Sequence, residues 1–486
     1  MADAMLFVHP ESHDPMPSES KPKIIAMIVG SAIIMQQIDS TVITTALPQM
    51  AISLHTDPVR LSVAVTAYLL SLAVFVPVSG WAADRFGGRT VFRAAIALFT
   101  LGSILCGISG NVVELTAARV LQGFGGAMMV PVGRLVLFRS VEKTALIATM
   151  AYLQVPAQLG PVLGPPIGGF ITTYFSWRWI FLVNVPLGIL GIVLVTLFFD
   201  NPKEGEARPF DMPGFLLTGA ALFCMMYAVE AAGRGRGDLG ELVVLLAFGI
   251  VAGVLGVRHL RSAKHPVLDV SVFRIPTFQS GISGGSLFRA GAGSLVFLLP
   301  LLLQLVFGMT AFASGTITFA TAVGSITMKM AAKPVLRRFG FRKVIVVNSL
   351  ISAATIAMCG FFTASTPVLL IFVLLLIAGF FQSLQYTATQ AMGYADIEQP
   401  QMSTATSIAS MAQQLSRGFG IALSAAVLHW SLAWRGATVL TTTDFMVAFC
   451  SLAFVALLNL PFGLVLRHDA AAAVSGHRAQ IRDRIA

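Results

Sequence analysis

The sequence predicts an all-α polytopic membrane protein in which two bundles of six helices are joined by two inserted helices, giving fourteen transmembrane spans. Hydrophobic residues make up 56% of the 486 residues, whereas charged residues make up only 11%. Soluble globular domains carry about 25% charged residues, so this composition excludes a soluble fold. In addition, windows of about 20 apolar residues, long enough to cross a bilayer as a helix, recur along the chain.

The predicted spans are separated by polar segments, and the seventh and eighth, both short, flank the segment 233–237. The first 20 residues are polar and acidic and lack the basic region that opens a signal peptide, so the first span is expected to be retained. The fourteen spans cover residues 24–46, 61–82, 91–110, 113–137, 145–171, 179–199, 212–231, 241–260, 276–303, 311–332, 343–363, 366–390, 404–430 and 444–466.

The distribution of Lys and Arg indicates the orientation of the chain. An even number of spans places both termini on one side, and 22 of the 32 Lys and Arg residues lie in tails, loops or span ends on that side, against five on the other. The remaining five lie within spans. Cytoplasmic loops are enriched in Lys and Arg, so both termini are predicted to be cytoplasmic. This distribution accounts for the net charge of +10 without a nucleic-acid partner.

A short motif recurs after the second span of each bundle. The segment Gly80–Arg89 reads G-W-A-A-D-R-F-G-G-R, and the segment Lys333–Arg342 reads K-P-V-L-R-R-F-G-F-R. Aligning Gly87 with Gly340 also aligns the flanking arginines, which indicates two homologous halves, a common plan in transporters. The acidic residue Asp84 of the first copy is replaced by arginine in the second.

The fifth span contains a string of glycine and proline, Q-L-G-P-V-L-G-P-P-I-G-G-F. A proline inside a soluble helix costs about 3 kcal/mol, but membrane helices tolerate it because neighbouring groups re-satisfy the freed backbone. Three glycines recur every four residues and share one helix face, where a second helix can approach closely. We expect a bent helix that serves as a pivot. Its candidate residues are Gly160, Pro161, Gly164, Pro165, Gly168 and Gly169.

These observations divide the chain into five segments. A cytoplasmic tail (1–23) precedes the first six-helix bundle (24–199), and two linker transmembrane helices with their flanking loops (200–270) lead to the second bundle (271–466) and a second cytoplasmic tail (467–486).

Four motifs, in order along the chain, resemble those of the major facilitator superfamily, specifically its fourteen-span drug:proton antiporters. The first span contains I-D-S-T-V-I-T-T-A-L-P, and the segment after the second span fits G-x-x-x-D-R-x-G-x-R. The fourth span contains R-V-L-Q-G, and the fifth contains the Gly/Pro string. Within the family, G-A-M-M-V-P-V-G-R-L at Gly126–Leu135 is similar to multidrug efflux members of enterobacteria.

The resemblance implies a proton-coupled antiporter that exports small, lipophilic or drug-like compounds by alternating access across the bacterial inner membrane. It implies two major-facilitator bundles and no cofactor, since the proton gradient would drive transport. The expected partners are the substrate, protons and the lipid bilayer. A periplasmic adaptor is compatible with such a protein, although no signal in the sequence supports one.

Asp39 is the only acidic residue well inside a predicted span, and Arg119 lies at a matching depth, roughly 10 Å below the outer face. An ionisable group at a helix centre costs roughly 2.5–3.5 kcal/mol on insertion scales, so each is a candidate for function. The resemblance places both helices around a central cavity and ties the motif of Arg119 and Gln122 to proton transfer. We expect Asp39 to bind the transported proton and Arg119 to adjust its proton affinity or compete for it. The alternative is an ion pair that only holds the two spans together.

Arg289 and Arg417 lie near the middle of spans nine and thirteen and have no acidic residue in their own or obvious neighbouring spans. They require a water-filled cavity, backbone carbonyls or an anionic ligand, and at least one is expected to face the substrate path. The alternative is that both brace discontinuous helices. Other candidates for the substrate cavity, for which packing hydrogen bonds are an equally good explanation, are Gln36, Gln382, Gln385 and Gln413.

The predicted gating loop comprises Gly80, Asp84, Arg85, Gly87 and Arg89. Gly87 permits a tight turn. Asp84 could cap a helix N-terminus or pair with a cationic group across the bundle interface, to be released by protonation or substrate. A basic loop that only fixes topology is compatible with the same residues.

Two other functions remain open. The first is a dedicated proton-coupled exporter of one metabolite, such as an amino acid, a sugar or a siderophore. The second is a non-transporting sensor or a membrane enzyme on the same fold. The sequence has no phosphate-binding loop and no catalytic or metal-ligating cluster. All eight histidines lie in tails, loops or span ends, which argues against an enzyme.

Overall fold

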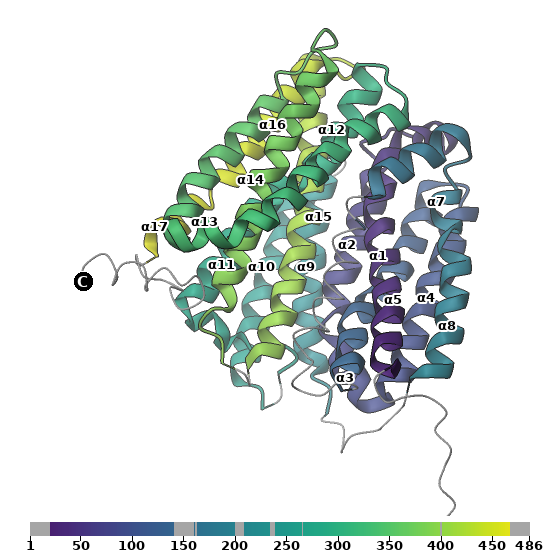
Figure 1. The fold of residues 1–486 in the computed structure, drawn as a ribbon, viewed down its shortest axis with the longest axis vertical. Coiled ribbons are helices and arrows are strands. Elements are labelled where there is room, and N and C mark those ends of the chain that lie inside the picture. Colours follow the sequence, from purple (N-terminus) through teal and green to yellow (C-terminus); the bar gives the residue numbers. More distant parts are fainter. Residues whose placement is uncertain are drawn as a thin grey trace, which may run out of the picture.

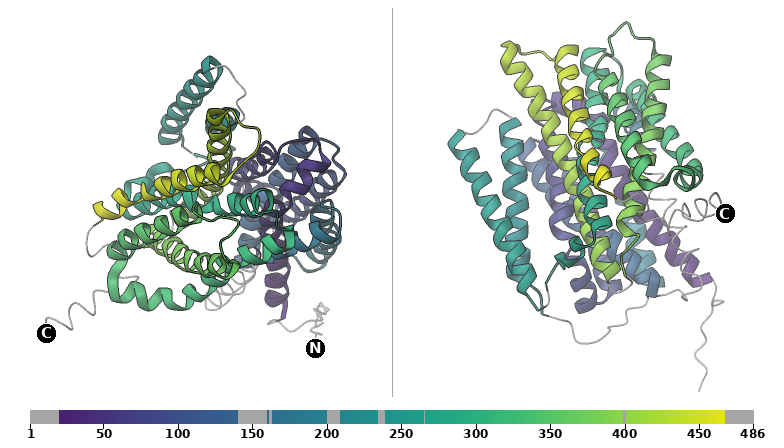
Figure 2. Two further views of the ribbon diagram at one scale, coloured as in Figure 1. Left: turned by 90° about the horizontal axis from the view of Figure 1, so that it is seen from above. Right: turned by 90° about the vertical axis from the view of Figure 1, so that its left-hand side faces the viewer.

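The computed structural model describes residues 20–139, 160, 163–199, 209–233, 239–264, 266–398 and 401–466. Within these ranges the regular structure is entirely helical. Figure 1 shows two groups of long helices side by side, and Figure 2 shows a further pair of helices standing at one side of them. We call the end of the molecule at the top of Figure 1, where residues 109–111 lie, the outer end. The opposite end is the inner end. These names follow the predicted orientation.

The first bundle packs around α5, which contacts α1, α2 and α4, while α8 packs against α1 and α4. Residues 163–174 form a further helix of this half. The elements of the first bundle are α1 (Ser20–Ser53), α2 (Ser62–Phe75), α3 (Val78–Phe86), α4 (Gly88–Ile108), α5 (Val112–Arg139), α7 (Trp179–Leu182) and α8 (Asn184–Phe198).

The second bundle packs around α11, which contacts α14, α15 and α16, while α13 packs against α14 and α16. Its elements are η2 (Val270–Arg274), α11 (Pro276–Gly293), α12 (Leu295–Leu301), the π-helical turn η3 (Leu302–Val306), α13 (Ala311–Cys359), α14 (Val368–Tyr394), α15 (Met402–Arg435), α16 (Thr442–Leu457) and α17 (Leu460–Val465).

The inserted helices α9 (Met212–Gly233) and α10 (Leu239–Ser262) pack against each other, and α9 also packs against α15 and α2. The pair therefore lies along the seam between the two bundles. Asp211 joins α9 to α10: its Oδ1 lies 2.7 Å from His259 Nε2 and accepts from Gly214 N, and its Oδ2 accepts from Val267 N at 3.1 Å. Burial alone would raise the pKa of Asp211, but these hydrogen bonds outweigh it and lower the pKa.

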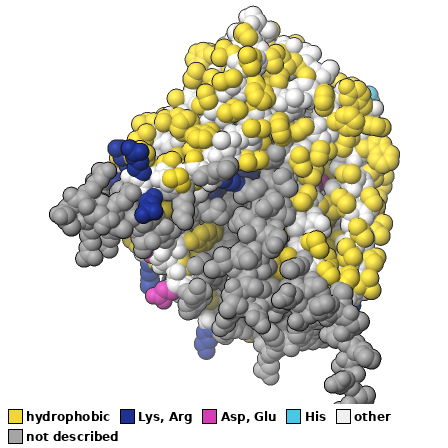
Figure 3. All heavy atoms as spheres, in the orientation of Figure 1, with side chains coloured by type: hydrophobic (Ala, Val, Ile, Leu, Met, Phe, Trp, Pro, Cys, Tyr) yellow, Lys and Arg dark blue, Asp and Glu magenta, His cyan; other side chains and the backbone are white. Residues whose placement is uncertain are grey.

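Eleven helices among the described residues are long and apolar enough to cross a membrane, or twelve when α2 and α3 count as one span. Hydrophobic side chains cover most of the described surface in Figure 3, as expected for a protein surrounded by lipid. The predicted fifth span lies mostly outside the described residues, and the predicted thirteenth is the 34-residue α15, which is not among those twelve. Fourteen spans and cytoplasmic termini therefore stay predictions.

The first helix is longer than predicted. It continues to Ser53 instead of ending at residue 46, although Pro48 lies inside it. A proline removes one backbone hydrogen bond, and membrane helices can absorb this loss. Asp39 is therefore fourteen residues, or roughly 21 Å, from the outer end of its helix rather than seven residues.

The predicted second span is not one straight helix. α2 and α3 meet at an angle of 56° across Val76 and Pro77. Proline has no N–H and crowds the preceding turn, which accounts for the bend at this position. Most of the segment predicted as a gating loop consequently belongs to α3 and to the first turn of α4.

Gly87 and Gly340 share a backbone conformation that other residues rarely adopt. Gly87 has φ 86° and ψ 140°, and Gly340 has φ 74° and ψ 162°. A Cβ atom is strained at such a positive φ, so glycine is required at both positions. The two aligned copies of the motif thus make the same turn, one between α3 and α4 and the other inside α13.

The evenly spaced glycines of the fifth span lie against α1. Cβ atoms built on Gly160, Gly164 and Gly168 would collide with Gln37, Thr41 and Thr45, respectively. These contacts follow one face of α1 over two turns, so the absence of side chains on the glycines sets the distance between the helices.

Gly168→Ala should destabilise the protein, because the added Cβ would lie 2.8 Å from Val42 O and still closer to Thr45 Oγ1. We expect a loss of about 1–3 kcal/mol, typical of overpacking, measured as a lower thermal unfolding temperature of the purified protein in detergent. Gly253→Ala is the matched control, since its Cβ would meet only Ala221 Cβ at 3.6 Å. Equal unfolding temperatures for the two variants would contradict this packing.

Candidate functional site

A buried ion pair between α1 and α5 forms the centre of the candidate site. Arg119 Nη1 donates to Asp39 Oδ2 at 2.6 Å, and both side chains are shielded from solvent, at 0% and 1% exposure. The sequence predicted these two residues at one depth, and the structure places them in direct contact. Each charge is compensated by the other, as buried charges require.

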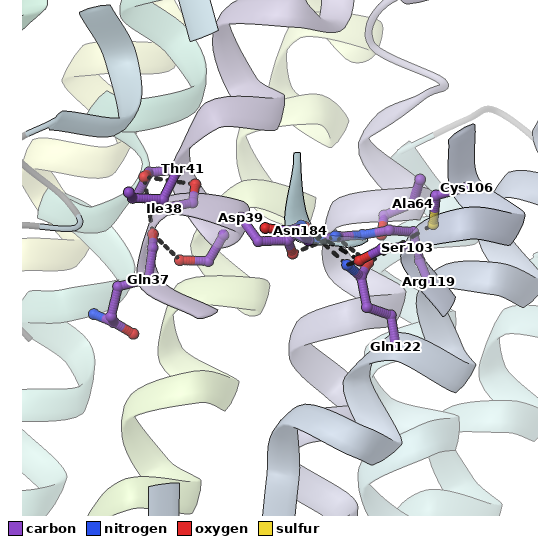
Figure 4. A network of polar contacts seen from close by, with 11 residues as sticks. Gln37, Ile38, Asp39, Thr41, Ala64, Ser103, Cys106, Arg119, Gln122 and Asn184 are labelled. Carbon is purple, nitrogen blue, oxygen red and sulfur yellow. Dashed lines mark hydrogen bonds and ion pairs between the residues drawn. The ribbon is translucent and has the colours of Figure 1, made fainter. Parts of the chain in front are cut away.

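Gln122, one turn after Arg119 on α5, connects the pair to α4. Its Oε1 accepts from Arg119 Nη1 at 2.7 Å, and its Nε2 donates to Asp39 Oδ1 at 2.8 Å and to Ser103 Oγ at 2.7 Å. Cys106 Sγ lies 3.7 Å from the same Oε1. The amide therefore uses both donors and its acceptor within the network (Figure 4).

Asn184, the first residue of α8, brings another helix into the network. Its Nδ2 donates to Asp39 Oδ1 at 3.2 Å and to Ser103 Oγ at 3.3 Å. The carboxylate of Asp39 thus faces donors from Arg119, Gln122 and Asn184. Sequence reasoning gave Asn184 and Ser103 no role, and the available signal was a lone polar side chain within each apolar run.

α2 covers the remaining side of the guanidinium. Arg119 Cζ lies 3.9 Å from the centroid of the Tyr68 ring, a cation–π distance, and Arg119 Nε donates weakly to Ala64 O at 3.4 Å. Arg119 Nη2 has no hydrogen-bond partner among the described residues. Tyr68 was also missed, because aromatic residues in apolar spans are usually packing residues.

Glutamines near Asp39 do not all point into the network. Figure 4 shows Gln37 and Thr41 on the side of α1 away from Arg119. Gln36 is buried, and its Nε2 lies 3.2 Å from the position of a Cβ on Gly126 of α5. It therefore lies between α1 and α5, and its Oε1 has no partner among the described residues.

A neutral hydrogen-bond network in the second bundle, which we call the clamp, uses Ser, Gln and Asn, the neutral residue types of the charged network. Gln385 Nε2 and Asn459 Nδ2 both donate to Ser349 Oγ at 2.9 Å, and Asn348 Nδ2 donates to Gln385 Oε1 at 3.0 Å. Gln385 was a candidate for the substrate cavity, with packing hydrogen bonds as an equally good alternative, and in the structure it is fully buried and bonded to Asn348 and Ser349 of α13.

Relative to the aligned glycine turns, the clamp lies at a different position from the charged network. Ser349 is nine residues after Gly340, whereas Ser103 is sixteen residues after Gly87. The difference of seven residues is about two helical turns, or roughly 10 Å, toward the inner end.

Arg289 and Arg417 lie in the second bundle, and neither has an acidic partner among the described residues. Arg289 is 7% exposed, and its Cζ lies 5.4 Å from the centroid of the Tyr386 ring. Arg417 is half-buried, and its Cγ lies 3.7 Å from the position of a Cβ on Gly293 of α11. Gln382 is buried on α14 and Gln413 is half-buried on α15.

The residues of the predicted gating loop are largely helical. Gly80, Asp84 and Arg85 belong to α3, with Asp84 and Arg85 exposed near its C-terminal end. Only Gly87 has a non-helical backbone. Arg89, in the first turn of α4, donates through Nη2 to Thr196 O of α8 and so braces the inner end of the first bundle.

Direct contacts join the two halves at the outer end. Gln304 Nε2 donates to Thr45 O at 3.0 Å and Gln49 Nε2 donates to Gln304 Oε1 at 3.2 Å. Phe312 N donates to Thr173 Oγ1 at 3.0 Å. Within the Gly/Pro string, Gly169 lies against Ala311 and Phe312, and Pro165 lies against Gly315. Pro161 falls outside the described residues.

A second buried acid escaped sequence reasoning. Asp444, in the first turn of α16, accepts from Arg435 of α15 and from Ser431 Oγ, and it forms a capping box with Thr441. Its position at a helix N-terminus, with an arginine nearby, accounts for its burial. The contact fastens α15 to α16 at the outer end.

The comparisons with known sequences agree along nearly the whole chain. Residues 29–260 and 281–482 match the Major Facilitator Superfamily. A protein of Escherichia coli O157:H7 named "Putative multidrug resistance protein MdtD" is 36% identical over 433 residues, covering 88% of this chain and 91% of that protein. The protein of the same name from Shigella sonnei strain Ss046 is 37% identical over 437 residues, with the same coverage.

Solved structures share the fold at low sequence identity. A bacterial homolog of the human lysosomal transporter Spinster, inward-facing and unoccupied, has a TM-score of 0.63 at 15% identity and covers 96% of this chain and 97% of its own. A D-xylose-proton symporter has a TM-score of 0.64 at 15% identity, covering 92% and 99%. The chain belongs to the Major Facilitator Superfamily and is a multi-pass membrane transporter related to the multidrug resistance proteins of enterobacteria.

Proposed function

We propose that the protein is a proton-coupled antiporter that exports small, lipophilic or drug-like compounds from the cytoplasm by alternating access. The observation that carries the proposal is the carboxylate of Asp39, buried between helices and bound to Arg119 at 2.6 Å. The names of the enterobacterial relatives support drug-like substrates. No cofactor is needed, because the proton gradient is the driving force.

Asp39 is the group in the network suited to carry the proton. Arg119 does not lose its proton in proteins, and the amides of Gln122 and Asn184 do not titrate. In the structure the carboxylate faces a guanidinium and two amide donors. Hydrogen bonds and a positive charge stabilise the ionised form of a carboxyl group. Protonation of Asp39 would remove its attraction to Arg119 and loosen α1 from α5.

The conformation is consistent with one half of an alternating-access cycle. The outer-end contacts of Gln49, Thr173 and Gly169 with the second bundle hold that end together. Transport requires these contacts to separate in the opposite state. Gly160, Gly164 and Gly168 pack against Gln37, Thr41 and Thr45 on α1, below and above Asp39 along the helix, so movement at Asp39 would reach the outer end through α1.

The proposal includes fourteen spans, cytoplasmic termini and a place in the bacterial inner membrane. The distribution of Lys and Arg supports the orientation. A dedicated exporter of one metabolite would use the same coupling and differ only in substrate breadth, so a substrate screen distinguishes the two.

Proton movement induced by substrate tests the function. In proteoliposomes with an imposed pH gradient, several unrelated lipophilic compounds should each move protons through the wild-type protein. Asp39→Asn should abolish this movement, because the amide keeps the shape of the side chain but carries no proton. A response to one metabolite alone would make the protein a dedicated exporter, and equal movement in the variant would refute the role of Asp39.

A double-mutant cycle separates coupling from packing. Removing one member of a buried ion pair costs about 3–5 kcal/mol, because the other charge is left uncompensated. Arg119→Ala should therefore lower the unfolding temperature more than the double variant Asp39→Asn/Arg119→Ala. The double variant should fold but not couple proton movement to transport. Normal coupling in a folded double variant would leave the pair with a structural role only.

A cross-link at the outer end should stop transport. The 3.0 Å bond from Phe312 N to Thr173 Oγ1 brings the two backbones close, near the roughly 4.4–6.8 Å between Cα atoms that a disulfide needs. In a variant whose four native cysteines are replaced by alanine, oxidised Thr173→Cys/Phe312→Cys should be inactive and reduction should restore transport. Full activity of the oxidised form would show that this contact need not open.

A further inference from the structure

We propose that the substrate carries an acidic group, such as a carboxylate, which binds between Arg289 of α11 and Arg417 of α15. The inference rests on the proposed export function and specifies its substrate class. It begins from two positive charges inside the second bundle for which the described part of the protein supplies no negative charge.

The two arginines share one face of α11. Arg417 lies against Gly293, four residues or one turn after Arg289, so both side chains meet the same side of this helix. Close packing holds the two helices here, because a Cβ on Gly420 of α15 would collide with Ala290 O of α11. The positive charges of Arg289 and Arg417 repel each other, and both groups interact electrostatically with Tyr386.

Neither guanidinium has a hydrogen bond or an ion pair among the described residues. Arg289 Cζ lies 5.4 Å from the centroid of the Tyr386 ring. Its Nη1 lies beside Gly285, 3.5 Å from where a Cβ of that residue would be. Each guanidinium carries five N–H donors and stays charged. An aromatic ring offsets only part of the cost of burying such a group.

Two acidic residues are buried among the described residues, and both are already engaged. Asp39 is bound to Arg119, and Asp444 is bound to Arg435 at the outer end. From Pro276 to Tyr394, the stretch that includes α11, α13 and α14, the sequence contains no Asp or Glu. An acidic group on the substrate would supply the negative charge that these described helices lack.

A third unsatisfied donor lies one turn from Tyr386 on α14. Gln382 is 8% exposed, and its Nε2 has no hydrogen-bond partner among the described residues. The unpartnered buried acceptors among the described residues of this half are neutral and cannot compensate two charges: Asn348 Oδ1, Gln414 Oε1 and the hydroxyls of Ser314 and Ser352. Two guanidinium groups and an amide N–H form a donor set suited to a carboxylate or another oxyanion.

The site is also connected to the proton-binding network. Arg417 interacts electrostatically with Tyr68 of α2, whose ring makes the cation–π contact with Arg119. α2 and α15 pack together, with Gly418 against Leu69. An anion at Arg417 would therefore act across the interface between the bundles, close to Asp39.

The first test needs no ligand. If the arginines are unpaired, Arg289→Gln/Arg417→Gln should unfold at the same or a higher temperature than the wild type, since two uncompensated charges, one buried and one half-buried, are removed. If they are bonded braces, the unfolding temperature should fall by several degrees, which would overturn the proposal. Lys329→Gln, which removes one exposed charge from α13, is the matched control.

The second test uses three probes of one shape: 2-naphthoate, 2-naphthamide and (2-naphthylmethyl)trimethylammonium. We expect naphthoate alone to raise the unfolding temperature and to move protons in proteoliposomes, and the double variant to need at least tenfold more of it for half-maximal effect. Preference for the amide or the cation, no effect of naphthoate, or an unchanged naphthoate response in the variant would overturn the proposal. Stabilisation by naphthoate without proton movement would support the anion site and count against antiport. Proton movement by the cation alone would support antiport and reject the anion site.

Discussion

The low dielectric of the membrane interior is the constraint on which this structure depends, and the bond between Asp39 and Arg119 is the clearest response to it. An isolated charge is expensive there, so the pair requires α1 and α5 to meet at one depth. The donors that complete the shell come from α4 and α8, and Tyr68 of α2 covers the guanidinium. Most of the first bundle is therefore arranged around one carboxylate.

Much of the fold could be predicted from the sequence because apolar length and charge distribution are strong signals in membrane proteins. Twelve of the predicted spans, the repeated turn at Gly87 and Gly340, and the close packing of the evenly spaced glycines all follow from local sequence. The bend at Pro77 and the extension of α1 past Pro48 were not predicted, because a proline's effect in a membrane depends on neighbouring helices. The sequence alone does not distinguish these two prolines.

The charged residues of the site could be predicted from the sequence, whereas its neutral residues could not. Asp39 and Arg119 stand out because burying them demands an explanation. Ser103 and Asn184 are small and neutral, and their role depends on which helices meet, a question of tertiary structure. Gln385 shows the same limit, since its polarity suggested a cavity or a packing hydrogen bond equally well, and in the structure its amide bonds to Asn348 and Ser349.

The two bundles hold their helices together with the same Ser–Gln–Asn arrangement, but only the first adds an acid and a base. The clamp of Ser349, Gln385 and Asn459 is built from hydroxyl and amide groups that keep their protonation over the whole physiological range. Among the predicted spans of the second half, Asp444 and His429 are the only Asp, Glu or His residues, and both lie toward the outer end. Proton binding at Asp39, as the proposed function requires, would thus change the charge of one bundle and leave the centre of the other electrically constant. Under the proposed function, the first bundle responds to the proton, and the second, with the fixed positive charges of Arg289 and Arg417, responds to the substrate. The interface between α2 and α15 would couple the two responses.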